Sequence, residues 1–176
     1  MSSKIGKACY IPLGHKSEKN INKNLVLNKL KPLLEDPSVK KIGQNIKFDF
    51  IVFFKQGIEL TAMEDTMLMS YVLDAGKNRH NMDTLSEIHL DHKTIAFKDL
   101  VGTGKKEINF SEVDIEKAKD YAAEDADITL RLYQKFKKSL KLEKMQNIYE
   151  VFEKPMIKIL AFMEIEGVKI DNKFLK

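Results

Sequence analysis

Two pairs of polar residues have the types and spacing that catalysis requires. Asn45 and Asp49 stand four residues apart, and so do Tyr121 and Asp125. On a helix, this spacing places both members of a pair on one face. Carboxylate oxygens are ligands for Mg²⁺ and similar cations, and a cation held by them can position and activate a water molecule. The two pairs therefore predict metal-assisted hydrolysis.

The neighbours of the two aspartates differ. Asp49 is surrounded in sequence by apolar residues such as Phe48 and Phe50. Because an unpaired carboxylate beside buried surface is costly, Asp49 is expected to have a partner or a metal. Asp125 follows Glu124 in an acidic stretch, so a solvated acidic helix face is the stronger alternative there.

Hydrophobic spacing and turn residues predict strands that alternate with helices, which is the pattern of an α/β fold. Asp65 is predicted to cap a helix, and 91–109 is predicted to be a loop. Strands are expected over 8–13, 39–42 and 58–60, and helices over 24–34, 45–55, 66–73, 82–90, 121–140 and 141–166, the last interrupted or kinked at Pro155.

Composition limits the class of protein. The chain has 176 residues, of which 43% are hydrophobic and 32% charged, as in ordinary folded proteins. Cys9 is the only cysteine, which excludes a disulfide framework or a cysteine-based zinc site within one chain. No stretch approaches the ~20 apolar residues of a membrane span, so we expect no membrane partner and a cytoplasmic location.

The net charge of +4 conceals an uneven distribution. Residues 1–47 have net charge +7, residues 48–127 have −8, and residues 128–176 have +5. An acidic middle between basic flanks suits a metal site supported by contacts to backbone phosphates. A lysine-rich chain with solvated faces is the simpler interpretation of the lysines.

Four segments carry a resemblance to a known family. They are 41–49, 64–68, 79–85 and 121–127, and the first and last contain the two pairs. Together they resemble the 3′-5′ exonuclease (proofreading) domain of bacterial DNA polymerase I, a family A polymerase, within the DEDDy exonuclease superfamily. The resemblance covers nearly the whole chain, and Asn-x-x-x-Asp followed by Tyr-x-x-x-Asp matches the second and third motifs of that superfamily.

The resemblance implies a two-metal site using Mg²⁺ or Mn²⁺, with Asp49 and Asp125 as metal ligands. Tyr121 would orient the attacking water, so the implied catalytic residues are Tyr121, Asp125 and Asp49. The implied substrate is the 3′ end of single-stranded DNA. The residues implied to contact or steady it are Gln44, Asn45, Arg79 and Phe97, although Phe97 is equally well interpreted as a core residue.

The first motif of the superfamily, Asp-x-Glu on the first strand, does not occur before Gln44. We therefore expect a ribonuclease-H-like exonuclease fold, a mixed sheet flanked by helices, without its first strand or strands. Residues 1–140 would form the N-terminally truncated exonuclease domain. Residues 141–176 would be a helical segment leading into an absent polymerase domain.

With two of four implied carboxylates lacking, the isolated chain is expected to be weak or inactive as a nuclease. Three alternatives remain open. The chain could be a non-catalytic module that binds single-stranded nucleic acid, or half of a split polymerase completed by a polymerase chain or fragment that supplies Asp-x-Glu. The third alternative is a gene remnant without an independent role.

Overall fold

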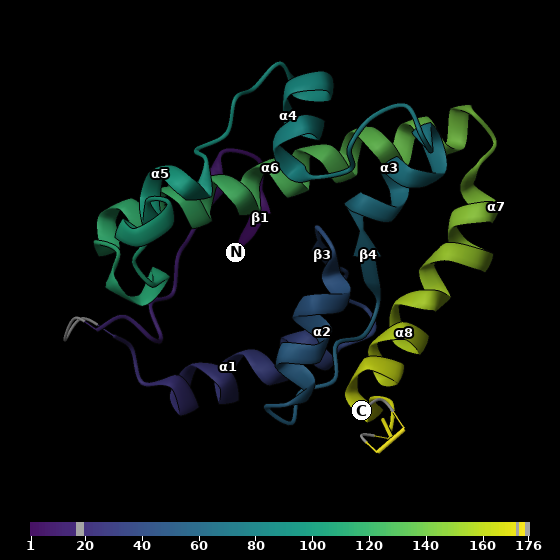
Figure 1. Cartoon of the computed structure of the whole chain (residues 1–176). Coiled ribbons are helices and arrows are strands. Elements are labelled where there is room, and N and C mark those ends of the chain that lie inside the picture. Colours follow the sequence, from purple (N-terminus) through teal and green to yellow (C-terminus); the bar gives the residue numbers. More distant parts are fainter. Residues whose placement is uncertain (17–19, 172, 175–176) are drawn as a thin grey trace.

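The computed structural model describes residues 1–16, 20–171 and 173–174. Two short strands lie at the centre, and helices surround them (Figure 1). A long helix runs along one side, two helices descend beside the central strands, and two further helices lie below them (Figure 1). No helix in the described part of the chain is both long and apolar enough to cross a membrane.

The strands confirm the α/β class, but those described pair as two separate two-stranded sheets instead of one mixed sheet. The strand predicted over 58–60 is wrong, and of the strand predicted over 8–13 only Ala8 is in a strand. Ile58 and Leu60 are buried without strand pairing, because an apolar run reports burial and not the hydrogen bonding that defines a strand. The antiparallel pair is β1 (Ser2–Lys4) with β2 (Lys7–Ala8), and the parallel pair is β3 (Lys41–Gly43) with β4 (Met63–Asp65).

The regular helices follow the predicted segments closely, with three exceptions. The predicted loop contains a short helix, α5, and α6 begins six residues before its predicted start. The predicted C-terminal helix is divided by a turn at 143–145. The helices are α1 (Lys23–Glu35), α2 (Ile46–Phe54), α3 (Thr66–Asp74), α4 (Met82–Leu90), α5 (Phe97–Val101), α6 (Ile115–Leu142), α7 (Gln146–Ile148) and α8 (Lys154–Glu166), with short 3₁₀ turns η1 (Gly104–Lys106) and η2 (Phe110–Glu112) and a π-helical turn η3 (Tyr149–Glu153).

The C-terminal helical segment breaks at 143–145, and it also has a π-helical turn directly before Pro155, where an interruption or kink was predicted. Lys144 has a φ of 59°, a left-handed conformation that ends α6 and turns the chain into α7. Pro155 lies in the first turn of α8 and directly follows the π-helical turn η3, which ends at Glu153 with helical backbone angles. The chain direction therefore changes at 143–145, and the helical run that follows changes from a π-helical turn to an α-helix next to the proline.

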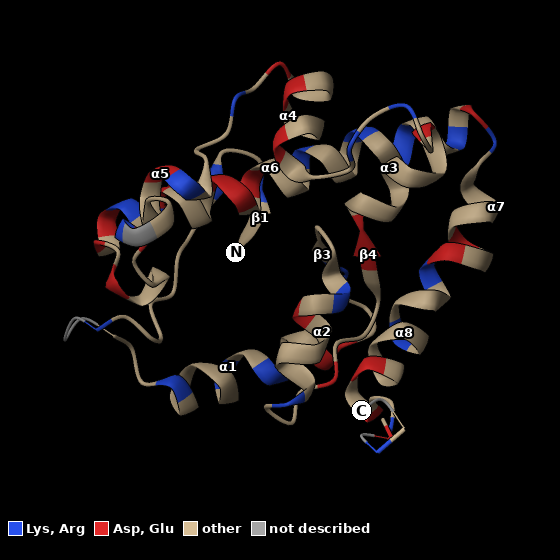
Figure 2. Ribbon diagram, in the orientation of Figure 1, with Lys and Arg blue, Asp and Glu red and all other residues tan. Residues whose placement is uncertain are grey.

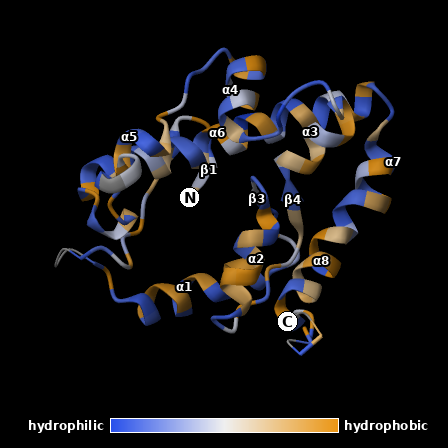
Figure 3. Ribbon diagram, viewed as in Figure 1, coloured by the Kyte–Doolittle hydropathy of each residue, from blue (hydrophilic) through white to orange (hydrophobic). Residues whose placement is uncertain are grey.

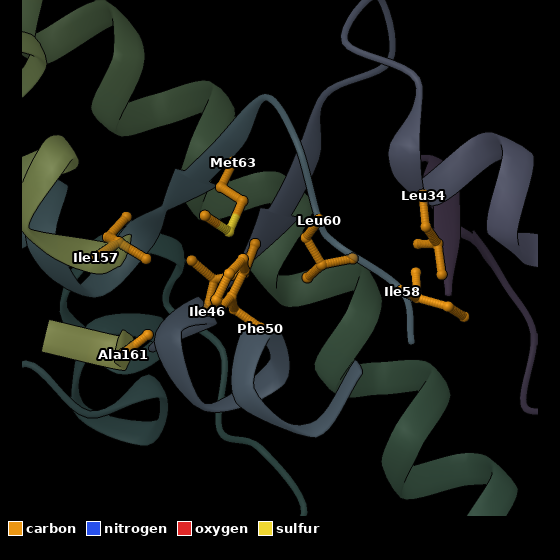
Figure 4. Close-up of a cluster of buried hydrophobic side chains, with 8 residues drawn as sticks. All are labelled: Leu34, Ile46, Phe50, Ile58, Leu60, Met63, Ile157 and Ala161. Carbon is orange, nitrogen blue, oxygen red and sulfur yellow. The ribbon is translucent and has the colours of Figure 1, made fainter. Parts of the chain in front are cut away.

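Two main hydrophobic clusters hold the helices against the strands. The first joins α1, α2, β4 and α8 around the fully buried Phe50 (Figure 4). The second lies between α3, α4, α6 and η3 around Leu132 and Tyr149. Figure 3 shows α2 as largely hydrophobic and α6 as a helix of mixed character. The first cluster fixes α2 and the second fixes α6, so the elements that carry Asp49 and Asp125 are anchored separately.

A buried carboxylate connects the strands to the C-terminal helices. Glu64, 2% exposed, pairs with Lys40 at 2.9 Å and Lys154 at 3.1 Å and accepts a hydrogen bond from the Tyr149 hydroxyl at 3.1 Å. Burial alone would raise the pKa of Glu64, but the two ammonium groups hold it below its usual value of 4.5.

We expect Glu64→Gln to lower the free energy of unfolding by about 2 kcal/mol at pH 7, because charge-assisted hydrogen bonds are lost. A lowered folded-state pKa means that the charge of Glu64 stabilises the fold above pH 4.5 and ceases to do so as the pH falls below it. Urea unfolding should therefore show that the difference in free energy of unfolding between the wild type and Glu64→Gln becomes smaller at acidic pH. Glu59→Gln, in an exposed pair with Lys158, is the control and should change stability by under about 0.5 kcal/mol. Equal losses in both variants would contradict the prediction.

Candidate active site

Asp49 lies on the exposed face of α2, and the opposite face of this helix is buried. Ile46 and Phe50 point into the first cluster, while the Asp49 side chain reaches solvent. Protein atoms nevertheless surround its carboxyl group closely enough to limit its hydration. This desolvation, together with the charge of nearby Asp65, raises the pKa of Asp49 to about 6. Among the described residues, no cationic side chain pairs with Asp49.

Asn45 precedes α2 and does not lie on its face. Its backbone is left-handed, with φ 58° and ψ 49°, a conformation that asparagine adopts more readily than most residues. The expectation that Asn45 and Asp49 share a helical face is therefore wrong, because α2 begins only at Ile46. The left-handed turn directs the first amides of α2 toward one acceptor.

That acceptor is Asp65, which is 1% exposed. Its carboxylate accepts hydrogen bonds from the amides of Asn45 and Ile46, both at 3.0 Å. It also accepts from Met67 at 2.9 Å and Leu68 at 3.4 Å, at the start of α3. The predicted cap of α3 is confirmed, and the same carboxylate also caps α2. One residue thus fixes the relative position of the two helix starts beside Asp49.

Gln44 forms a hydrogen bond with the residue that follows Arg79. The Gln44 side-chain Nε2 donates to the carbonyl of His80 at 2.8 Å, and its Oε1 accepts from the Thr66 hydroxyl at 2.5 Å. Both ends of the amide are therefore engaged within the protein. Arg79 is exposed, and no ion pair to it occurs within the described residues. Gln44 accordingly anchors the segment that presents Arg79 to solvent.

Tyr121 and Asp125 lie on the same face of α6, as predicted. Burial raises the pKa of Asp125 to about 6, an effect that a hydrogen bond from Tyr121 opposes and the charges of Glu124 and Asp83 reinforce. Burial and the Asp125 charge also raise the pKa of the Tyr121 hydroxyl, so it stays protonated and can donate. The hydroxyl and the carboxylate are therefore close enough to shift each other's pKa.

Phe97 opens α5 and lies next to this pair. Its ring centroid is 5.9 Å from that of Tyr121 and 6.0 Å from that of Phe110, with which it stacks. The side chain is 48% exposed, so one face packs on the aromatic group and the other remains open. The core interpretation of Phe97 is thus only half right, and its contact with a substrate stays a prediction.

Two acidic residues near the site were not predicted to belong to it. Asp83 raises the pKa values of both Tyr121 and Asp125, and it accepts a hydrogen bond from the Thr94 hydroxyl at 2.6 Å. Glu124 accepts from the Ile95 amide at 2.7 Å, which holds the segment leading to α5. Asp83 lies within the segment 79–85 that carried the family resemblance, so a signal for it was present.

The structure arranges the predicted residues as two groups. Tyr121, Asp125 and Phe97 lie together on α6 and α5, whereas Asp49 and Asn45 lie with Asp65 at the start of α2. Both α2 and α6 contact β3, which stands between the groups. In the residues that the structure describes, no three histidine, cysteine or acidic side chains come close enough to hold a metal ion by themselves.

These features define a class of small α/β domains. In this class, two helices beside a short parallel strand pair carry partly desolvated carboxylates. The chain belongs to the 3′-5′ exonuclease family, whose model matches residues 1–141. It is 43% identical to DNA polymerase I of Rhizobium leguminosarum over 96% of its length, and 40% identical to DNA polymerase I of Pseudomonas aeruginosa over 98%. It spans only 18% and 20% of those two relatives.

Solved structures share the fold at lower identity. A structure described as the POL domain of Pol1 from M. smegmatis, in complex with DNA primer-template and dNTP, superposes with a TM-score of 0.68 at 18% identity. It is matched over 88% of this chain and 24% of its own. Brucella melitensis NrnC superposes with a TM-score of 0.63 at 20% identity, over 88% of this chain and 70% of its own. These likenesses confirm the ribonuclease-H-like exonuclease fold.

Proposed function

We propose that this chain is the 3′-5′ exodeoxyribonuclease module of a DNA polymerase I-type enzyme. It would act on 3′ ends of single-stranded DNA in the cytoplasm when the missing carboxylates are supplied, and it would be weak or inactive alone. The observation that carries the proposal is the state of Asp49 and Asp125. Each has a pKa raised to about 6 by its surroundings, and neither has a cationic partner among the described residues. A carboxylate in such a position gains most from a divalent cation.

Asp49 and Asp125 would supply oxygen ligands to Mg²⁺ or Mn²⁺. The cations, when bound, activate a water molecule and stabilise the charge on the leaving oxygen. Two carboxylates are too few to hold two cations, so the chain's own residues fit the site only in part. Tyr121, whose hydroxyl stays protonated, would donate a hydrogen bond to the attacking water and keep it in line.

The remaining predicted residues would position the DNA. Arg79, exposed and without an ion pair among the described residues, would contact a phosphate, and the open face of Phe97 would stack on a base. The side-chain amide of Gln44 is hydrogen-bonded within the protein. We therefore propose that Gln44 holds the segment that carries Arg79 and does not itself contact the DNA. Asn45, exposed at the start of α2, would steady the substrate near Asp49.

The domain division is also a proposal. Residues 1–140 would form the exonuclease unit, and residues 141–176, of which 172, 175 and 176 lie outside the described residues, would lead toward a polymerase domain. The two acidic groups around β3 are consistent with a partner chain or segment that supplies the Asp-x-Glu carboxylates. A binding module without chemistry is the alternative, because the described residues offer no group of three metal-binding side chains.

A chimera tests the proposal. Replacing the matching segment of Rhizobium leguminosarum DNA polymerase I with this chain places its residues in a complete relative. We expect digestion of a 3′-labelled single strand, falling by at least about 10³-fold in Asp49→Ala and in Asp125→Ala.

Asp99→Ala, an exposed acid on α5, is the matched control for the chimera and should leave digestion unchanged. A folded chimera without 3′ digestion, or one indifferent to both aspartates, would contradict the proposed roles. Retained single-strand binding in such a chimera would favour the binding module.

A further inference from the structure

Tyr149 brings a hydroxyl group from the C-terminal helices to the strand that precedes α3. The residue is 1% exposed and belongs to the second hydrophobic cluster. Its hydroxyl accepts a hydrogen bond from the main-chain amide of Asp65 at 2.9 Å and donates one to Glu64 at 3.1 Å. Burial raises the pKa of the Tyr149 hydroxyl, so it keeps the proton that it donates. In Figure 2 the acidic end of β4 is red, and the C-terminal helices run past it.

The hydrogen bond to Asp65 connects Tyr149 with the helix that carries Asp49. The Asp65 carboxylate accepts from the amides of Asn45 and Ile46, both at 3.0 Å, at the start of α2. Asp49 lies in the first turn of that helix. A movement of the Asp65 main chain would therefore move the start of α2 or break these hydrogen bonds. One residue, Asp65, thus links the hydroxyl of Tyr149 to the turn that presents Asp49.

The Tyr149 hydroxyl provides the acceptor that a neighbouring strand provides in a larger sheet. In the described part of the chain, β4 pairs with β3 alone. The Asp65 amide, at the end of β4, is buried and donates to the hydroxyl instead of to a carbonyl of another strand. A buried amide without an acceptor is costly, so the position of Asp65 depends on this one oxygen atom.

The backbone at Tyr149 has an irregular form that accompanies this contact. Tyr149 is the first residue of the π-helical turn η3, which lies between α7 and α8. Single π-helical turns within helical runs are often found at functional sites. After this turn, Ile157 and Ala161 of α8 pack with Phe50 of α2 in the first hydrophobic cluster. The C-terminal segment thus holds α2 twice, through this packing and through the hydroxyl of Tyr149.

We infer that Tyr149 is a positioning residue of the proposed nuclease: through Asp65 it holds the first turn of α2, and with it Asp49, in place for the cations. This inference rests on the proposed function. Residues after 141, which lie beyond the match to the family model, would therefore contribute to the geometry of the site. The ring of Tyr149 packs in the core, whereas its oxygen fixes Asp65, so a variant that removes the oxygen alone separates the two roles.

Tyr149→Phe in the chimera with DNA polymerase I of Rhizobium leguminosarum measures the effect on the reaction. We expect the kcat for digestion of a 3′-labelled single strand at saturating Mn²⁺ to fall about tenfold, because Asp49 is less well placed. The KM for DNA should change by less than about twofold, since Tyr149 is buried and does not contact the substrate. Circular dichroism checks that the variant is folded.

Hydrogen exchange of the purified chain, without metal or DNA, gives a second measurement. The amides of Asn45 and Ile46 should exchange at least about tenfold faster in Tyr149→Phe than in the wild type, because the start of α2 opens more often. The amides of 128–136 in α6 should exchange at the wild-type rate.

Tyr133→Phe is the matched control, because Tyr133 is another buried tyrosine of the second cluster, 7% exposed. Its hydroxyl accepts a hydrogen bond from Lys40 at 3.4 Å, and among the described residues it forms none with Asp65. Unchanged kcat and unchanged exchange in this control support the inference. Equal changes in both variants would overturn it, and so would a Tyr149→Phe chimera that loses stability but keeps its kcat.

The exchange measurement separates this inference from the proposed function. A chimera that does not digest DNA at all would contradict the proposed function. Exchange at Asn45 and Ile46 would still decide whether the hydroxyl of Tyr149 holds α2, and an unchanged rate there in Tyr149→Phe would show that it does not.

Discussion

A 3′-labelled single strand should remain largely intact when it is incubated with the purified chain in millimolar Mn²⁺. The rate of digestion should be at least about 10³-fold below that of the chimera. The physical reason is the number of ligands. Asp49 and Asp125 belong to separate acidic groups, and two carboxylates cannot bring two cations together. Removing part of a cooperative catalytic unit loses most of its effect. Binding should persist weakly and fall with salt, because Arg79, Phe97 and the lysines remain.

Paired variants separate chemistry from binding in this experiment. Arg79→Ala with Phe97→Ala should weaken single-strand binding about tenfold, since a stacked base contributes roughly 1–3 kcal/mol. Lys93→Ala with Phe174→Ala, also an exposed cation and an exposed aromatic, should not. Robust digestion by the wild-type chain, lost in Asp49→Ala with Asp125→Ala, would show that other residues complete the site.

The structure limits which acids could complete it. Glu35 is engaged with Lys31, Asp36 accepts hydrogen bonds from Ser38, and Glu64 is enclosed by its two lysines. Glu18 lies outside the described residues. Asp83, which is close enough to raise the pKa of Asp125, is therefore the first residue to substitute if the chain digests DNA.

The half of the site on α6 could be predicted from the sequence because it depends on one regular helix. Tyr121 and Asp125 lie within a long α-helix, where a spacing of four residues guarantees proximity. The same rule failed for Asn45 and Asp49, because the helix begins between them. Helix starts depend on which side chain caps them, and here the cap comes from Asp65, twenty residues away.

Strand positions and the C-terminal break were predicted less well for a related reason. Apolar runs such as 58–60 are buried by packing, whereas pairing depends on a partner strand that periodicity does not identify. The break occurs at Lys144, which has a left-handed backbone conformation. No glycine or proline stands there to indicate a helix end in the sequence. The short α5 has only five residues, too few for a helical period to be recognised, and its position depends on Glu124, which holds the preceding segment from α6.

Replacing Asp65 with alanine should lower the free energy of unfolding by about 3–5 kcal/mol, a large part of the 5–15 kcal/mol typical of a domain. Each ordinary helix cap contributes about 1 kcal/mol, and Asp65 caps both α2 and α3. In addition, the part-buried amide of Asn45 would be left without an acceptor, at about 1–3 kcal/mol. Urea unfolding followed by circular dichroism measures the loss.

Asp114 provides the matched control, because its carboxylate caps α6 alone, through the amides of Glu116 at 3.0 Å and Lys117 at 3.4 Å. Asp114→Ala should therefore lose only about 1 kcal/mol. Asp65→Asn keeps one acceptor oxygen and should fall between the two alanine variants, which keeps the comparison open if Asp65→Ala does not fold. Similar losses for Asp65 and Asp114 would show that the cap on α2 contributes little, and that the position of Asp49 is set by the packing of Phe50 instead.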